Sequence, residues 1–245
     1  MAGTEQRRIV RSMTTTNELG QPVGVPLGTW EPPPFPPRRD LEGRTVRVVP
    51  LDTVRDGDAL FESLSGAADS LWTYMAFGPF ETLEDFKTML DSLAGYEDWL
   101  PYTIFVDHHA VGFAAYLRIQ PRDGVIEIGS IVFSPRLQRT TAATEAIYLM
   151  LRNVFALGYR RCEWKCDDLN APSRAAADRL GFTYEGTFRQ ATHYKGRNRD
   201  TAWYAIVNRE WPALDGVFQR WLAPDNFDDD GVQRQSLGKM RETML

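Results

Sequence analysis

The sequence predicts an α/β protein of the α+β type, with a mixed, mostly antiparallel sheet of about seven strands flanked by helices. Short apolar runs alternate with longer runs whose apolar residues recur three and four apart, in the order βααβββαβαββ. The first strands are joined by short turns, which favours hairpins. A strand–helix–strand order around residues 138–166 implies one parallel crossover.

The composition is typical of a soluble globular protein, with 43% hydrophobic and 25% charged residues among 245. A net charge of −5 argues against a general nucleic-acid binder, which needs many Lys and Arg side chains to neutralise phosphates. No apolar run approaches the roughly 20 residues that cross a bilayer. Residues 1–13 lack the apolar core of a signal peptide. We therefore expect a cytoplasmic protein with no nucleic-acid or membrane partner.

The two cysteines, Cys162 and Cys166, are four residues apart in a run that is typical of a strand. Positions four apart lie on the same face of a strand. The spacing is not that of a CxxC zinc motif, and no histidine cluster accompanies it. This pattern predicts two reduced thiols and no metal site.

Seven prolines fall between Pro22 and Pro37, so this stretch can form neither a helix nor an inner strand. It is a disordered leader, an extended strap laid over the domain, or a polyproline ligand for another protein. Trp30 and Phe35 favour the strap, because aromatic side chains in a free tail would have no partner. We delimit a proline-rich extension at 1–43, a main domain at 44–212, and a C-terminal helix with a polar tail at 213–245.

The main domain is expected to open with a β-rich run at residues 44–51. Asp52 or Thr53 then has the character of a helix N-cap, and apolar residues follow at helical spacing. Thr82 begins a sequence similar to a capping box, with Asp in place of Glu or Gln, ahead of a second amphipathic helix.

Three strands are expected next, at residues 101–106, 110–119 and 125–133. The turn at 107–109 makes a hairpin of the first two. Gly129 interrupts the third run, which predicts a bulge or a close backbone approach there. Pro135 ends that strand.

A long helix is expected over residues 138–157, with Gly158 as its C-cap. Beyond residue 225 the chain is polar, which is typical of a mobile tail. The remaining elements are a strand at 160–166, a helix at 170–180, strands at 182–192 and 201–208, and a helix at 210–222.

Three motifs stand in a characteristic order. Residues 133–146 (FSPRLQRTTAATEA) span the central strand-to-helix junction, and residues 170–182 (NAPSRAAADRLGF) open the second helix. A third stretch runs from 184–190 (YEGTFRQ) to 199–204 (RDTAWY). Together they resemble the GNAT N-acetyltransferases, and NxxS followed by LGF resembles the branch of the ribosomal-protein N-terminal acetyltransferases.

The resemblance implies acetyl-CoA as co-substrate, no metal, and a central strand splayed from its parallel neighbour. A helix N-terminus binds phosphate through free N–H groups, which suits the CoA pyrophosphate. Thr141 stands where the family has a glycine, so its Cβ narrows the space through which the phosphate approaches the backbone. The residues implied to hold acetyl-CoA are Ile131, Val132, Phe133, Gln138, Arg139, Thr140, Thr141, Ala142, Ala143, Thr144, Asn170 and Ser173.

The resemblance also suggests candidates for catalysis. Ala177 occupies the place of a tyrosine acid found in many GNAT enzymes, whereas Ser173 matches a serine proposed to assist the leaving sulfur. Thr192 replaces a glutamate of the ribosomal-protein branch. The base is then the adjacent His193, or Glu127 on the central strand, or a solvent chain with no single base. The alternation around Glu127 is equally consistent with a solvent-facing side chain.

The expected activity is transfer of an acetyl group to the amine of a peptide N-terminus or a small molecule, by direct attack in a ternary complex. Alternatives are another acyl-CoA donor, a degenerate module that binds CoA or a partner without turnover, and an interaction protein acting through its leader. A homodimer is compatible with the sequence. The basic hairpin formed by Arg189, Lys195, Arg197 and Arg199 is a solvated turn, or it guides an acidic substrate or the CoA phosphates.

Overall fold

The computed structural model describes residues 14–244, and its contacts divide the chain into two units, residues 1–31 and 32–245. In the described part of the first unit, β1 (Thr14–Thr16) and β2 (Pro22–Gly24) pair as an antiparallel hairpin. The side-chain oxygen of Asn17 accepts hydrogen bonds from the backbone N–H groups of Leu19 and Gln21, which closes the turn.

The second unit contains an eight-stranded sheet with the order β3-β4-β5-β6-β7-β8-β10-β9, in which β7 and β8 are the parallel pair. This confirms the predicted fold class. The strand beyond the expected seven is β3, a two-residue strand. The bounds are β3 (Leu41–Glu42), β4 (Arg47–Pro50), β5 (Leu100–Val106), β6 (His109–Gln120), β7 (Val125–Phe133), β8 (Arg161–Asp167), β9 (Thr183–Tyr194) and β10 (Arg197–Val207).

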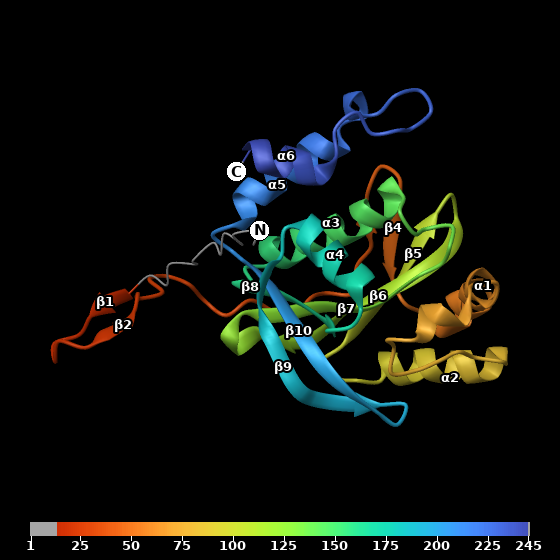
Figure 1. The fold of residues 1–245 in the computed structure, drawn as a ribbon, viewed down its shortest axis with the longest axis horizontal. Helices are drawn as coiled ribbons and strands as arrows, with labels where there is room; N and C mark the ends of the chain where they lie inside the picture. Colours follow the sequence, from red (N-terminus) through yellow and green to blue (C-terminus); the bar gives the residue numbers. More distant parts are fainter. Residues whose placement is uncertain (1–13, 245) are drawn as a thin grey trace, which may run out of the picture. The chain divides into compact units, whose positions relative to one another are not determined.

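Helices cover both faces of this sheet (Figure 1). One face packs against α3 and α4, and the other against α1 and α2, so two hydrophobic cores form. Short 3₁₀ segments are η1 (Asp69–Trp72), η2 (Pro121–Asp123) and η3 (Pro224–Asn226). The α-helices of the described chain are α1 (Thr53–Ser65), α2 (Leu83–Ala94), α3 (Thr141–Ala156), α4 (Ala171–Leu180), α5 (Trp211–Leu222) and α6 (Leu237–Met244).

N-cap residues determine where the helices begin. Asp52 accepts hydrogen bonds from two backbone N–H groups of α1, and Thr82 accepts one in α2. The long helix α3 begins at Thr141 rather than at Gln138, because Arg139 has a φ of 63° and Thr140 is the N-cap. The end of the chain also differs from the expected mobile tail: α6 packs on α5 and α4 and buries apolar side chains.

Gly129 marks a bulge in β7, as predicted. The register with β6 shifts between the pairs Phe113–Val132 and Ala115–Gly129, so β7 contains one extra residue there. Ser130 within this bulge has a φ of 49°. The bulge bends β7 just before its C-terminal end.

The segment from residue 32 to 40 lies along the second unit as an extended strap. The hydroxyl of Tyr159 donates to the carbonyl of Pro34, and Arg39 donates to the Asn153 side chain at 2.6 Å. Phe35 is 45% exposed, whereas Pro33 and Pro36 are buried, so these two prolines, rather than Phe35, pack against the unit.

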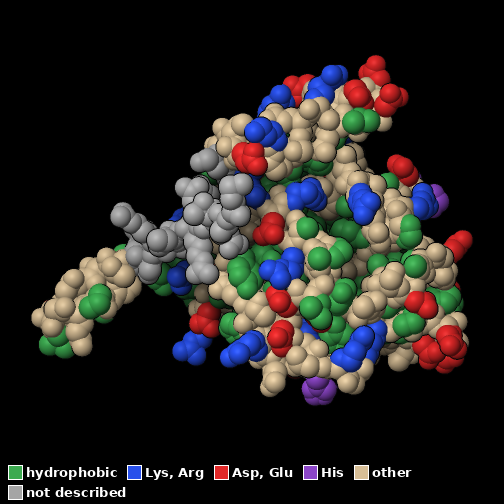
Figure 2. Space-filling view, in the orientation of Figure 1, with side chains coloured by type: hydrophobic (Ala, Val, Ile, Leu, Met, Phe, Trp, Pro, Cys, Tyr) green, Lys and Arg blue, Asp and Glu red, His purple; other side chains and the backbone are tan. Residues whose placement is uncertain are grey.

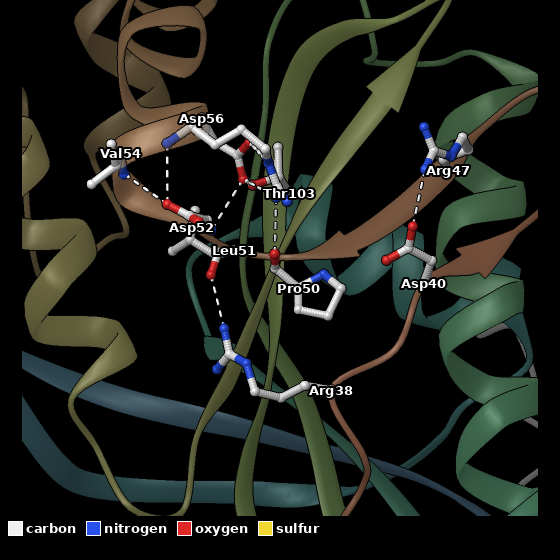
Figure 3. Close-up of polar contacts among 10 residues, drawn as sticks. Arg38, Asp40, Arg47, Pro50, Leu51, Asp52, Val54, Asp56 and Thr103 are labelled. Atoms are coloured by element: carbon white, nitrogen blue, oxygen red, sulfur yellow. Dashed lines mark hydrogen bonds and ion pairs between the residues drawn. The ribbon is translucent and has the colours of Figure 1, made fainter.

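The strap ends beside the junction of β4 and α1, which Figure 3 shows in detail. Arg38 donates to the carbonyl of Leu51 at 2.9 Å. The buried carboxylate of Asp56 accepts from the Thr103 hydroxyl at 2.6 Å and from the backbone of Asp52, which ties α1 to β5. A buried carboxylate is tolerated here because its oxygens have donors.

Basic and acidic side chains are interspersed over the face of the molecule shown in Figure 2. Within residues 14–244, no helix is long and apolar enough to span a bilayer. Both cysteines are buried free thiols.

Candidate active site

The parallel strands β7 and β8 separate after a short common stretch. Their register pairs end at Glu127–Glu163, whereas β8 continues to pair with β10 as far as Asp167. Among residues 14–244, the part of β7 from 128 to 133 therefore has no strand paired with it on its β8 side. This edge leaves room for an extended ligand, in the manner of β-strand addition.

The start of α3 follows the end of β7 closely. Gln138 donates from its amide to the Phe133 carbonyl at 2.8 Å and thereby holds the connecting loop against β7. The hydroxyl of Thr140 accepts from the N–H of Ala143 at 3.1 Å and caps α3. The N–H groups of Thr141 and Ala142, in the first turn, have no partner within the helix.

The expected acetyl-CoA residues differ in their accessibility at this helix start. Thr144 is buried and its hydroxyl accepts from Arg179 at 3.1 Å, so it serves packing between α3 and α4. Ala142 and Ala143 are also buried, whereas Arg139 is exposed. The accessible members of the set at the β7 end are thus Ile131, Phe133, Gln138, Arg139, Thr140 and Thr141, whereas the side chain of Val132 is buried.

Asn170 and Ser173 meet at the start of α4. The Asn170 side chain accepts from the Ser173 N–H at 3.1 Å, so Asn170 is a helix N-cap. The Ser173 hydroxyl accepts from the indole N–H of Trp164 at 3.1 Å. Burial raises the pKa of the nearby Cys166 thiol, although a hydrogen bond with Ser173 acts to lower it. Ser173 therefore lies on the face of the sheet that α3 and α4 cover.

Glu127 lies on the opposite face and is buried, not solvent-facing. Its Oε2 is 2.9 Å from the Lys165 ammonium, which is also 2.6 Å from Glu163. The ring of Trp203 covers the same ammonium, with its centroid 3.8 Å from Nζ. Arg118 is a weaker partner of Glu127 at 3.9 Å. A buried charge network thus lies at the point where β7 and β8 separate.

The pKa values of the two glutamates in this network are shifted in opposite directions. Burial raises the pKa of Glu127, and Lys165 opposes this only in part. Burial also acts to raise the pKa of Glu163, but hydrogen bonds from Lys165 and Arg161 outweigh it and lower that pKa. Glu127 is therefore the carboxylate of the network that is poised to take up a proton.

The free oxygen of Glu127 lies beside the bulge. A Cβ added to Gly129 would come within 3.1 Å of Glu127 Oε1. Because Gly129 has no Cβ, the Glu127 carboxylate can occupy this space. One oxygen is anchored by Lys165, and the other lies next to the strand segment that is free of ladder partners.

His193 is exposed on β9, and no contact joins it to Glu127 or Ser173 among residues 14–244. Its neighbour Tyr194 points the other way, and the Tyr194 hydroxyl donates to Asp167 Oδ2 at 2.7 Å. Burial, together with this hydrogen bond, raises the pKa of Tyr194 to about 12. The structure therefore brings Tyr194, not His193, to the end of β8.

Sequence reasoning missed Lys165, Asp167 and Tyr194. An available signal was the alternation of charge at Glu163, Lys165 and Asp167 in β8, which places all three on one strand face. That pattern also fits an ordinary solvated strand. What distinguishes the two is burial by Trp203, a residue of β10.

Unpartnered polar atoms fit a polar ligand at this place. The hydroxyl of Ser130 on β7, that of Ser134 directly after β7, and the indole N–H of Trp203 are buried without a hydrogen-bond partner among the described residues. Buried groups of this kind are normally satisfied, by protein, water or ligand. Together with the free edge of β7, they suit the amide-rich arm of a coenzyme A thioester.

Comparisons with known proteins agree with this geometry. Residues 46–183 match the acetyltransferase (GNAT) domain model. A comparison with proteins of curated function gave no match.

The solved structures include close relatives. A GCN5-related N-acetyltransferase from Brucella melitensis is 44% identical, with a TM-score of 0.85 over 88% of this chain and 100% of that one. A GNAT-family protein from Chromobacterium violaceum is 42% identical, with a TM-score of 0.76 over 79% and 98%. An acetyl transferase from Salmonella typhimurium that modifies the N-terminal serine of ribosomal protein L7/L12 shares the fold, at 22% identity and a TM-score of 0.60 over 69% and 99%. The chain belongs to the GNAT family and is an acetyl-CoA-dependent N-acetyltransferase.

Proposed function

We propose that the chain transfers an acetyl group from acetyl-CoA to the amine of a peptide N-terminus or a small molecule, by direct attack in a ternary complex. The observation that carries this proposal is the placement of Glu127. One of its oxygens is held by Lys165, and the other lies beside the bulge where β7 leaves β8. A fixed, buried carboxylate with a raised pKa is suited to general-base work.

Acetyl-CoA would be held by backbone groups and the two helix starts. Thr140 and Thr141 would bind the pyrophosphate at the N-terminus of α3, where the helix dipole favours negative charge. The free edge of β7 would bind the pantetheine arm. Asn170 would donate its side-chain N–H to this arm while its oxygen caps α4.

The gap between β7 and β8 lets groups from both faces of the sheet act on one thioester. Glu127 takes a proton from the ammonium of the acceptor on the α1/α2 side. The amine nitrogen then forms its bond to the acetyl carbon while N–H groups near Val132 polarise the carbonyl oxygen. As the carbon–sulfur bond breaks, Ser173 on the α3/α4 side, whose oxygen accepts from Trp164, donates its proton to the thiolate and regains one, through water, as the attacking nitrogen loses its second proton.

The test combines binding with turnover. Wild type, Glu127→Gln and Glu185→Gln are titrated with acetyl-CoA by calorimetry and assayed for CoA release with a panel of amino-terminal peptides and small amines. Glu185 is a matched control, because it pairs with Arg161 at the far end of the same charge network. We expect Glu127→Gln to lower kcat by about 10²- to 10⁴-fold, the usual range for a general base, with acetyl-CoA affinity within about twofold.

Wild-type kcat in Glu127→Gln would remove Glu127 from the mechanism. Binding of acetyl-CoA without release of CoA in the presence of any amine would indicate a module that binds without turnover.

A further inference from the structure

The hairpin of β9 and β10 extends from the sheet toward α2 (Figure 1). Its tip is a two-residue turn at Lys195 and Gly196, both with positive φ. Lys195 Nζ donates to the Trp72 carbonyl at 2.7 Å, and Arg197 donates to that of Thr73 at 3.4 Å. The tip therefore reaches the connection between α1 and α2.

Three cations lie along this part of the hairpin, and we call Lys195, Arg197 and Arg199 the hairpin cluster. The guanidinium groups of Arg197 and Arg199 lie 6.0 and 5.8 Å from the centroid of the Tyr194 ring. The hydroxyl of this tyrosine contacts Asp167 at the end of β8. The hairpin cluster thus lies at the open end of the separated strands, on the side of Glu127.

None of the three cations has a carboxylate partner among the described residues. By contrast, Lys165 and Arg174 nearby each have one within 2.9 Å. Arg199 Nε is buried without an acceptor from residues 14–244. Burial, together with the charge of Arg197, lowers the pKa of Lys195. Like charges held together without an anion are unfavourable, so the arrangement fits an anionic ligand.

The chemistry of the cluster indicates which anion. A guanidinium binds carboxylates through paired, charge-assisted hydrogen bonds. The expected pyrophosphate site lies at the start of α3, at the end of β7, and already offers helix N–H groups. The hairpin cluster lies at the turn and on β10, separate from that helix start, and can serve the acceptor.

Resting on the proposed function, we propose that the hairpin cluster binds a carboxylate of the acceptor, so that the enzyme prefers amines that carry an acidic group. The amine then faces Glu127 while the carboxylate faces Arg199. The acidic group comes from a peptide side chain or from a small amino acid, and these two sources are separated by experiment.

The test uses matched acceptors that differ only in charge. The peptides Ser-Asp-Glu-Phe-amide and Ser-Asn-Gln-Phe-amide form one pair, and β-alanine and its amide form the other. Release of CoA gives kcat/KM for wild type, Arg199→Gln and Arg189→Gln. Arg189 is the matched control, an exposed arginine on the same hairpin that lies outside the cluster.

We expect the acidic member of at least one pair to be favoured by about tenfold or more, the equivalent of one charge-assisted contact. Arg199→Gln should remove this preference through KM, with acetyl-CoA affinity unchanged, and Arg189→Gln should keep it. Which pair responds identifies a peptide or a small acceptor. Equal kcat/KM within both pairs, or an equal loss for neutral and acidic acceptors in Arg199→Gln, would overturn the inference while leaving acetyl transfer intact.

A binding measurement decides the inference even without turnover. The N-acetylated forms of the two peptides and of β-alanine and its amide are titrated into the CoA-saturated protein by calorimetry. Tighter binding of an acidic member, lost in Arg199→Gln, supports the cluster as a carboxylate site even if no amine is acetylated. Failure of turnover alone would then count against the proposed function only. Equal binding within both pairs contradicts the inference directly.

Discussion

Replacing Lys165 by Met removes the cation between Glu127 and Glu163. Glu163 keeps Arg161 as a partner at 2.9 Å, whereas Glu127 keeps only Arg118 at 3.9 Å. At 2.9 Å and an effective dielectric constant near 20, the lost attraction between Lys165 and Glu127 is about 6 kcal/mol. The desolvation of Lys165 is also removed, so we expect a net loss of about 3–5 kcal/mol in the free energy of unfolding near pH 8.

This loss should depend on pH in a defined direction. Without Lys165, the pKa of Glu127 rises further above its unfolded value, because burial is then nearly unopposed. A group whose folded pKa is raised contributes stability below its unfolded pKa, and that contribution disappears as the pH rises through the folded pKa. In Lys165→Met, stability should therefore fall by about 1.4 kcal/mol per pH unit between the two pKa values.

Urea denaturation at pH 5, 6, 7 and 8 measures this effect. The control is Lys87→Met, which breaks the exposed ion pair with Asp58 at 2.8 Å and should cost at most about 1 kcal/mol. The double variant Glu127→Gln/Lys165→Met should recover part of the stability at pH 8, since no buried charge is left unpaired. A loss in Lys165→Met that is independent of pH, or no larger than that of the control, would refute the argument.

Three further predictions concern the same region. Gly129→Ala should lower stability by about 1–3 kcal/mol, measured by thermal denaturation, because the new Cβ would come within 2.7 Å of Leu117 Cδ1; an unchanged Tm would show that β7 relaxes there. Ser173→Ala should reduce kcat by about 10²-fold or more without changing acetyl-CoA affinity, as stopped-flow CoA release would show; an unaffected kcat would leave proton donation to water. Burial raises the pKa of both Cys162 and Cys166, so their reaction with a thiol reagent at pH 8 should be slow until the protein is denatured; fast labelling of the native protein would contradict this.

Local signals in the sequence determined most of the backbone. The N-caps Asp52, Thr82 and Asn170 act on N–H groups three or fewer residues away, so their role is readable from neighbouring residues. Gly129 predicted the bulge because a lone glycine in a strand has few other reasons to be there. Periodicity in the same way predicted the order of strands and helices along the chain and one parallel crossover, which is the pair β7 and β8.

Local signals were insufficient where an element is short or is stabilised by distant residues. Eight residues form α6, and only its packing on α5 and α4 reveals it as a helix. The hairpin also extends farther than expected, to Tyr194 and from Arg197. Its tip is fastened to Trp72, which lies 123 residues earlier in the chain.

The sequence by itself determined the strand and helix order, the helix caps and the family, because each depends on residues close together in the chain. Only the tertiary structure decided the environment of Glu127. Alternation along β7 is the same for a solvated carboxylate as for a buried one. The ammonium of Lys165 from β8 and the ring of Trp203 from β10 make it a buried, ion-paired carboxylate, and the sheet brings these strands together through pairings that no local pattern encodes.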